Sequence, residues 1–230
     1  MKSPVETVRG RVVGYDEKRA ELLIRAPYTD FPTMIRREFK ECLVQPIDSR
    51  PLSNKQRNMC YSLLRAISDY TGQGLGPTKE WMKIKFLVED MEQTGEKIFS
   101  LSNAPVSLVC AFQRYLIHFI LDFDIPCTFP LLEYVDDVPD YVYHCLVTKK
   151  CCICGAPTDL HHIDRVGMGR DRTDIIHEGL EVLPLCREHH KEAHGMSDQD
   201  FFIRYHLPGG IVMDKTLCRL YGLKAKKGAR

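Results

Sequence analysis

The chain has 230 residues, of which 44% are hydrophobic and 27% charged, and its formal net charge is +1. This composition is typical of a globular protein of one or two domains that buries a core without needing disulfides. The small net charge excludes binding to nucleic acid through the overall charge of the chain, so any nucleic-acid surface is a local patch.

The cellular compartment is indicated by what the sequence lacks. The N-terminus has no apolar signal-peptide core, and no segment is apolar enough to span a membrane. The most apolar segment, residues 106–123, is interrupted by four polar residues, Gln113, Arg114, His118 and Asp122. We therefore expect an intracellular, cytoplasmic chain in which clustered cysteines are reduced metal ligands and not disulfides.

The first 50 residues favour a small β-rich element. Residues 10–15 and 21–25 are rich in strand-forming side chains and flank a charged turn, which indicates a hairpin. Residues 42–45 are a further candidate strand, and Pro46 follows them as a break.

Helices are expected in the middle of the chain, over residues 51–132. Ser53 followed by Gln56 fits a capping box, and apolar residues then recur at helical spacing. Two further helices are expected over about residues 78–91 and 105–123.

Three shorter segments outside these helices also have predicted structures. Residues 98–102 are expected to be extended, and the acidic, proline-containing residues 133–140 suit a linker. Residues 211–230 are expected to form a basic tail, because six basic and no acidic residues follow from Lys215 onward.

Cysteines and histidines gather between positions 151 and 194. Two pairs, each with two intervening residues, lie within this segment: Cys151 with Cys154, and Cys186 with His189. Such paired knuckles supply a closed tetrahedral Cys3His set, which predicts a structural Zn²⁺ with no open coordination position. Cys152 is an alternative ligand to Cys151. The competing interpretation is a set of core thiols with a surface histidine, but the local density of these residue types exceeds ordinary usage.

A second group of histidines predicts a catalytic metal. His190 and His194 are spaced by one helical turn, so both can reach one ion, and His161 can add a third ligand from a strand. Three histidines leave positions open for water or phosphate. His162 points to the other face of the strand and can act as a general base. The alternative is that these are solvated histidines that share no ion.

These residues resemble the HNH, or ββα-metal, nuclease family, and within it HNH nucleases encoded by bacteriophages. The resemblance rests on the first knuckle, on HHIDRVGMGR at residues 161–170 and on LCREHHKEAH at residues 185–194. It implies hydrolysis of a DNA phosphodiester, with a divalent metal on His161, His190 and His194 and with His162 as the general base.

The residue at the position of the asparagine in the HNH motif differs from the family's usual residue. Glu181 stands where the family usually has an asparagine that braces the catalytic loop. Glutamate can accept backbone hydrogen bonds, so we expect Glu181 to take this catalytic supporting role, although it brings negative charge near the scissile phosphate.

The expected metal and DNA contacts follow from side-chain chemistry. An all-imidazole site suits Zn, Ni, Mn or Co, with Mg as a weaker alternative. Three arginines in a glycine-containing loop, Arg165, Arg170 and Arg172, are expected to contact DNA phosphates. The alternative is an ordinary solvated loop, because aspartates in the same loop dilute its positive charge.

The middle helices are loosely similar to a second phage family, the NinB (Orf) recombination mediators. The similarity lies in Gln56-Arg57, Trp81-Met-Lys83 and Asp124-Ile-Pro126. It implies binding to single-stranded DNA and to the host single-strand-binding protein. The alternative is a helical scaffold that shares only a helix pattern.

The sequence therefore predicts an α+β fold with a β-rich element (residues 1–50), a helical domain (51–132), a zinc-stapled HNH domain (141–210) and a basic tail (211–230). The predicted function is a metal-dependent endonuclease acting on DNA, possible substrates being single-stranded or branched forms. Its predicted setting is phage recombination or replication in the cytoplasm of an infected or lysogenic bacterial host. The alternatives are a non-catalytic single-strand DNA-binding mediator with a structural zinc domain and an RNA-processing nuclease.

Overall fold

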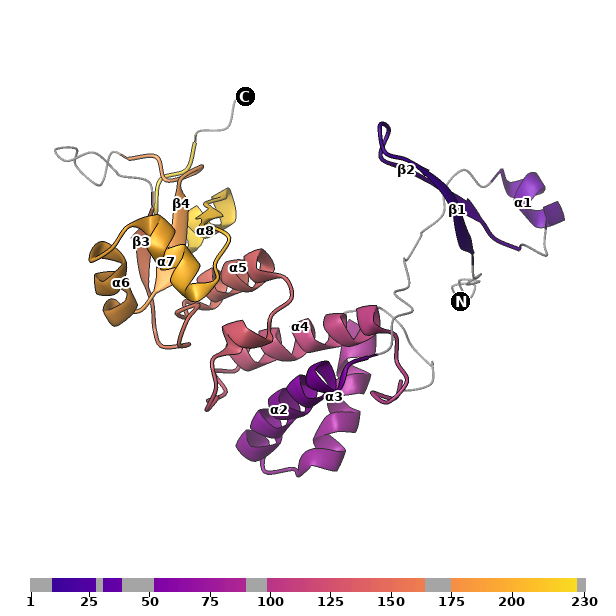
Figure 1. Cartoon of the computed structure of the whole chain (residues 1–230), viewed down its shortest axis with the longest axis horizontal. Coiled ribbons are helices and arrows are strands. Elements are labelled where there is room, and N and C mark those ends of the chain that lie inside the picture. The colour runs from indigo at the N-terminus through magenta and orange to yellow at the C-terminus, as the bar shows by residue number, and fades with distance from the viewer. Residues whose placement is uncertain (1–9, 28–30, 39–51, 90–98, 164–174, 227–230) are drawn as a thin grey trace. The chain divides into compact units, whose positions relative to one another are not determined.

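The computed structural model divides the chain into two compact units, residues 1–46 and residues 47–230. The residues that the structure describes are 10–27, 31–38, 52–89, 99–163 and 175–226 (Figure 1). Over these residues the chain forms helices and two small antiparallel sheets, which confirms the expected α+β class. No helix in these described ranges is long and apolar enough to cross a membrane.

The smaller unit contains a β-hairpin and one short helix. Strand β1 (Arg11–Asp16) pairs antiparallel with β2 (Glu21–Arg25), so the expected hairpin is confirmed. The Asp16 carboxylate accepts a hydrogen bond from the backbone N–H of Lys18 at 2.9 Å and stabilises the turn. Helix α1 (Phe31–Arg37) was not expected in a β-rich segment. The candidate strand at residues 42–45 lies outside the described residues.

Three helices form one layer of the larger unit: α2 (Asn54–Thr71), α3 (Leu75–Glu89) and α4 (Val106–Asp122). The expected capping box is confirmed, because the Ser53 hydroxyl accepts from the Gln56 N–H while the Gln56 side chain accepts from the Ser53 N–H, both at 3.2 Å. The helices enclose Phe86 and Phe112, whose ring centroids lie 5.4 Å apart. This layer therefore has an apolar interior supplied by all three helices.

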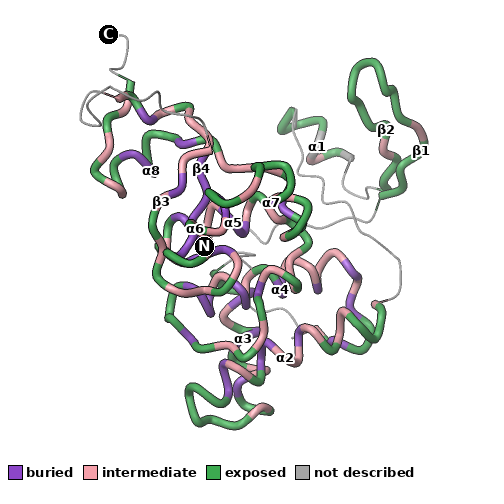
Figure 2. Tube along the Cα trace, turned by 60° about the vertical axis from the view of Figure 1, so that its left-hand side comes forward, coloured by how far each residue is buried: buried purple, intermediate pink, exposed green. Residues whose placement is uncertain are grey.

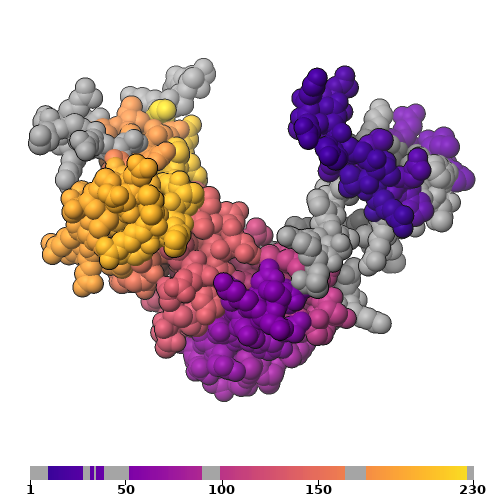
Figure 3. Space-filling view, viewed as in Figure 1, coloured from indigo at the N-terminus to yellow at the C-terminus, as the bar shows by residue number. Residues whose placement is uncertain are grey.

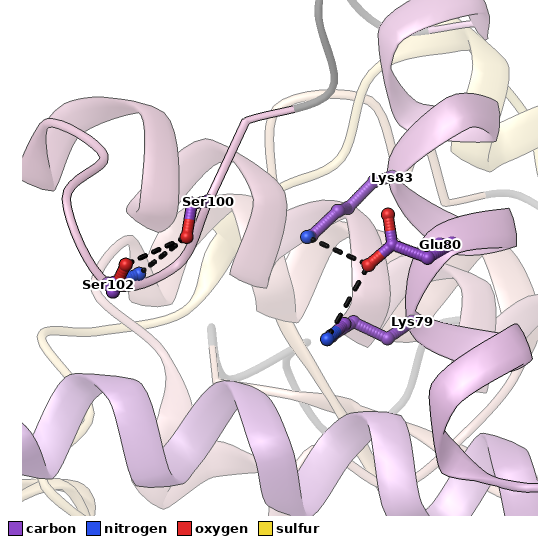
Figure 4. A network of polar contacts seen from close by, with 5 residues as sticks. All are labelled: Lys79, Glu80, Lys83, Ser100 and Ser102. Carbon is purple, nitrogen blue, oxygen red and sulfur yellow. Dashed lines mark hydrogen bonds and ion pairs between the residues drawn. The ribbon is translucent and has the colours of Figure 1, made fainter.

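One charged side chain is buried in this layer. Lys83 of α3 is 4% exposed, and its ammonium nitrogen lies 3.3 Å from the Glu80 carboxylate (Figure 4). The same nitrogen lies 5.5 Å from the centroid of the Phe99 ring. The carboxylate and the aromatic face offset part of the cost of removing the ammonium group from water.

The segment between α3 and α4 differs from the expected extended piece at residues 98–102. The Ser100 carbonyl accepts from the N–H groups of Asn103 and Ala104, and the Ser102 N–H donates to the Ser100 hydroxyl (Figure 4). The described part of this segment is therefore a turn, because the serine bonds its own neighbours in place of a partner strand.

The expected linker at residues 133–140 is instead largely helical. A 3-10 helix, η1 (Leu131–Tyr134), is followed by α5 (Val138–Thr148). The Asp137 side chain caps α5 by accepting from the Asp140 N–H at 3.1 Å. Pro139 lies in the first turn, where a helix requires no backbone donor, so the proline that suggested a linker is compatible with a helix start.

The second layer of the larger unit is a small antiparallel sheet with short helices around it. Strands β3 (Asp159–His162), β4 (Glu181–Leu185) and β5 (Ile211–Val212) pair in the order β3-β4-β5. Helices α6 (Arg187–His194), α7 (Asp198–Tyr205) and α8 (Lys215–Leu220) complete it. Since β4 leads directly into α6, the strand register fixes where that helix begins.

The two layers share one core. A single cluster of buried residues extends from Leu63 and Phe112 in the helices to Leu185 and Phe201 in the sheet layer. In the space-filling view, α4 and α5 lie between the α2–α3 pair and the sheet layer (Figure 3). Buried residues follow α4, α5 and β4 across this junction (Figure 2).

The segment expected as a basic tail is folded over residues 211–226. β5 pairs with β4, and Asp214 caps α8 by accepting from the Leu217 N–H at 2.7 Å. Leu217 and Cys218 are fully buried. The basic residues indicated a tail, whereas the apolar residues between them form a buried face.

The start of helix α3 also differs from the prediction. The helix begins at Leu75, earlier than expected.

Candidate metal centres

The first knuckle is a tight turn between α5 and β3. The Cys151 N–H donates to the Ala156 carbonyl at 2.7 Å, and the Gly155 N–H donates to the Cys151 carbonyl at 2.8 Å. Gly155 has a φ of +72°, a left-handed conformation that glycine adopts without steric cost. This turn brings the sulfur atoms of Cys151 and Cys154 to one side of the backbone.

The second knuckle is the start of α6. Cys186 is the N-cap residue, and its carbonyl accepts from the His190 N–H at 2.8 Å. The Cys186 side chain makes no capping hydrogen bond and instead lies 3.1 Å, Sγ to Nδ1, from His189 in the first turn. The helix start thus presents a sulfur and an imidazole nitrogen together.

The structure brings all four predicted knuckle residues together, with their ligand atoms within 4.8 Å of one another. The Sγ atoms of Cys154 and Cys186 lie 3.7 Å apart, and Cys151 Sγ lies 3.6 Å from His189 Nδ1. A tetrahedral zinc with ordinary bond lengths places such ligand atoms roughly 3.5–3.8 Å apart. The donor set and its spacing therefore fit a zinc ion.

Cys151 binds a metal ion only as a thiolate, and its burial disfavours that charged form. Burial raises the pKa of the Cys151 thiol to about 12, so the thiolate forms there only when a positive charge stabilises it. Cys152 is also buried but lies outside the group, with its N–H donating to the Pro184 carbonyl at 3.0 Å. This backbone hydrogen bond directs the Cys152 side chain toward the core of the fold.

The second candidate centre lies between β3 and α6. His161 of β3, His190 and His194 place their ligand nitrogens within 4.8 Å of one another. The His161 ring centroid lies 4.7 Å from that of His190 and 5.0 Å from that of His194. The two α6 residues share a face because they are one helical turn apart.

Two of these imidazoles, those of His161 and His190, favour the neutral form that binds metal. Burial, and then the neighbouring His190 and His194, lower the pKa of His161 to about 4. Burial, and then His194, also lower the pKa of His190. The buried Nδ1 of His161 has no hydrogen-bond partner among the described residues. A neutral imidazole with an unsatisfied buried nitrogen suits coordination of a cation.

His162 lies next to His161 on β3, and strand alternation turns it to the opposite face. Its Nε2 lies 2.9 Å from Nδ1 of His177, a side chain that is 6% exposed. No role is expected for His177 from the sequence, because its spacing fits no ligand motif. The one available signal was its place among the six histidines of the Cys/His-rich segment.

The remaining predicted site residues are placed only in part. Glu181 opens β4, and its carbonyl accepts from the Ile163 N–H at 3.0 Å, so its backbone lies beside the residue after His162. The supporting role of its side chain remains a prediction. The three candidate DNA-contacting arginines, Arg165, Arg170 and Arg172, lie outside the described residues.

Comparison with known proteins gives one match. A family model described as "Putative HNHc nuclease" matches residues 37–224, a range that contains both candidate metal centres and the helical layer. No curated protein and no solved structure matches the chain. The resemblance of the middle helices to recombination mediators, and a phage source, find no support in these comparisons.

Proposed function

Because the chain belongs to the HNHc nuclease family, we propose that it is a metal-dependent endonuclease that hydrolyses phosphodiester bonds of DNA. The expected membership in the HNH family is thereby confirmed. The observation that carries the proposal is the convergence of imidazole nitrogens from His161, His190 and His194. A fourth histidine, His162, follows His161 on β3.

In this proposal the two candidate centres have different roles. The Cys3His group holds a structural Zn²⁺, because four protein ligands leave no position for a reactant. The three-histidine group holds a divalent cation with open positions, and an all-imidazole set suits Zn, Ni, Mn or Co better than Mg. When bound there, such a cation supplies Lewis acidity toward a phosphate oxygen.

The protein's own residues orient and activate the attacking water. His161, His190 and His194 fix where the phosphate is held, and the lowered pKa values of His161 and His190 favour the neutral form that binds a cation. His162 accepts a proton from the water, and the resulting hydroxide bonds to phosphorus while the bond from phosphorus to the opposite 3′ oxygen breaks. The leaving 3′ oxygen then takes a proton from solvent. Glu181 supports the backbone that leads away from His162, and Arg165, Arg170 and Arg172 contact neighbouring phosphates.

The biological setting is proposed from resemblance alone. It places the enzyme in phage DNA recombination or replication, acting on single-stranded or branched DNA in the bacterial cytoplasm beside the host single-strand-binding protein. The loose similarity of the middle helices to recombination mediators is the basis for assigning DNA binding to those helices.

The experiment that tests the proposed function uses the purified full chain with each divalent metal on supercoiled, single-stranded and branched DNA and on RNA. We expect metal-dependent nicking of DNA and a loss of about 10²–10⁴-fold in rate for His162→Ala, the usual effect of removing a general base. Metal content should be unchanged, because His162 lies off the ligand group.

A matched control is His206→Asn. His206 is an exposed histidine outside both ligand groups, and asparagine tolerates its left-handed φ of +54°. This variant should cleave at the wild-type rate. Absence of cleavage of any nucleic acid with any metal would overturn the proposed function and favour a DNA-binding role for the zinc domain. Rescue of His162→Ala by added metal would make His162 a ligand.

A further inference from the structure

Strand β2 of the smaller unit presents an edge that no described strand covers. The β1–β2 hairpin precedes the range matched by the nuclease family model, residues 37–224, so family membership assigns it no role (Figure 1). In the described part of this unit the sheet has only these two strands. An isolated two-stranded hairpin is marginally stable in water, and its outer edges offer unpaired N–H and C=O groups to a further strand.

The side chains of β2 are exposed although they are apolar. Leu22 is 56% exposed and Leu23 is 66% exposed. Because side chains alternate along a strand, Leu22 and Ile24 lie on one face of the hairpin and Leu23 on the other. Soluble proteins usually protect such an edge with lysine, proline or a bulge. The sequence of β2 has no lysine or proline, and the one shift of register lies in β1, between Val12 and Gly14. The edge of β2 is therefore the one better suited to pairing.

The sequence of β2 is complementary to itself when two copies run antiparallel. The strand reads Glu-Leu-Leu-Ile-Arg over residues 21–25. When Leu23 lies on a two-fold axis, Glu21 of each copy lies opposite Arg25 of the other. In the same register Leu22 lies opposite Ile24 of the other copy, and the two copies of Leu23 face each other. Opposite charges and apolar side chains directly across a ladder both stabilise it, so each position of the strand has a favourable partner.

The same register compensates two like-charge pairs within the hairpin. Arg11 lies opposite Arg25 at the open end, and Asp16 lies opposite Glu21 at the turn. Like charges directly opposite each other destabilise a strand pair. Arg19 lies 4.0 Å from the Asp16 carboxylate, whereas no ion pair joins Arg11, Arg25 or Glu21 to another described residue. In a sheet ordered β1-β2-β2-β1, the arginine pair of each copy adjoins the acidic pair of the other.

We propose that β2 is a dimerisation strand: two copies of the chain pair antiparallel through their β2 edges, about a two-fold axis at Leu23, and form one continuous sheet. The occupant of the edge is a second copy because the complementarity is with the strand's own sequence. A five-residue edge is smaller than a standard interface of roughly 1,600 Å², so the dimer is reversible, with a dissociation constant in the micromolar range. The inference concerns assembly and does not depend on the proposed cleavage of DNA.

The first test reverses charges in the zinc-loaded full chain and measures association by sedimentation velocity over a range of protein concentrations. We expect the wild type to form a concentration-dependent dimer that weakens as salt is raised, because exposed ion pairs are screened. Arg25→Glu and Glu21→Arg should each raise the dissociation constant about tenfold or more, because each places like charges opposite each other twice in the symmetric dimer. Within one hairpin each change creates an opposite-charge pair, with Arg11 or with Asp16, so unfolding of the hairpin does not explain the loss.

An equimolar mixture of the two variants provides the sharpest comparison. One variant has acidic side chains at positions 21 and 25, the other has basic side chains there, and the mixed pair is complementary at both positions. We expect the mixture to associate at least as tightly as the wild type, whereas each variant alone does not. Lys55→Glu is the matched control, because it makes the same change of charge as Arg25→Glu at an exposed position of α2. It should leave the dissociation constant unchanged.

A second test examines the register and does not rely on charge. Leu23→Cys places two thiols opposite each other across the axis. Facing residues of an antiparallel pair have Cα atoms about 4.5–5.5 Å apart, a separation that a disulfide can span. We expect mild oxidation to give a dimer linked through position 23, identified by mass spectrometry of the joined peptides. Leu22→Cys should not link to itself, because the residue opposite it is Ile24 of the second copy.

The outcomes separate this dimer from other arrangements. Dimerisation that is weakened by both single changes, restored in the mixture and linked through position 23 supports the proposal. A wild-type chain that stays monomeric at high concentration overturns it, as does a dimer that neither charge reversal weakens. A mixture that fails to associate, or equal cross-linking of Leu22→Cys and Leu23→Cys, also overturns it. None of these measurements uses cleavage, so failure of the proposed function leaves their result unchanged.

Discussion

Gly210→Ala is expected to destabilise the sheet layer where the metal-binding strand ends. A Cβ at position 210 would lie 2.2 Å from Ile163 Cδ1, 3.1 Å from the Val182 carbonyl oxygen and 3.3 Å from Glu181 Cβ. The Ile163 methyl group can rotate away, but the Val182 carbonyl lies in β4, which pairs with both neighbouring strands. Overpacking of this kind costs about 1–3 kcal/mol in the free energy of unfolding.

The measurement is urea unfolding of the zinc-loaded full chain, followed by circular dichroism. Gly76→Ala is the matched control, because a Cβ at position 76 meets nothing within 4 Å and the residue lies in the first turn of α3. It should be neutral or stabilising by up to about 1 kcal/mol. Ile163→Val removes Cδ1, so it should relieve part of the loss in the Gly210→Ala background.

Two results would refute this reasoning. A Gly210→Ala variant as stable as the wild type would show that β5 can move away from β4 without cost. Additive effects of Gly210→Ala and Ile163→Val would show that the 2.2 Å approach to Ile163 Cδ1 contributes none of the strain, contrary to the partial relief expected.

Three further predictions concern metal and protons. The wild type should carry tightly bound zinc, and Cys154→Ser should lose it and lower the unfolding midpoint, as elemental analysis and thermal melts would show; zinc-free, active protein would contradict this. His190→Ala should weaken metal binding at the three-histidine centre, so that titration with excess metal partly restores cleavage while knuckle zinc is retained. Burial, and then the nearby His144, lower the pKa of His118 although Asp140 opposes this. The folded state thus favours the neutral imidazole of His118. Its contribution to the free energy of unfolding is full above the ordinary pKa of 6.5 and is lost as the pH falls below that value. His118→Gln should therefore reduce the fall in the free energy of unfolding below pH 6.5.

Local signals were sufficient to predict several elements from the sequence. The Ser53 capping box, the hairpin around Asp16 and the two metal knuckles each depend on residues a few positions apart. The convergence of His161 with α6 required one added assumption, that a strand lies against that helix. Such short-range patterns carry their own geometry, so the structure could bring these residues together as the sequence indicated.

The features that were missed depend on contacts between distant segments. Pro139 and its acidic neighbours suited a linker, but packing of α5 between the helical layer and β4 makes the same residues a helix start. His177 has no motif spacing, and its contact with His162 spans a segment that no local rule describes. The segment at residues 211–226 was judged by its charge, whereas its buried Leu217 and Cys218 decide its structure.

The shared core of the larger unit has a thermodynamic consequence. Cys151 of the first knuckle and Leu185, which precedes the second knuckle, belong to the same buried cluster as Phe112 of α4. Tyr141 of α5 donates its hydroxyl to the Cys152 carbonyl at 3.1 Å. Zinc that binds only the folded form stabilises everything that unfolds with the knuckles. By reciprocity, a cavity made at Phe112 should weaken zinc affinity. The dissociation constant of zinc then reports the stability of helices that do not contact the ion.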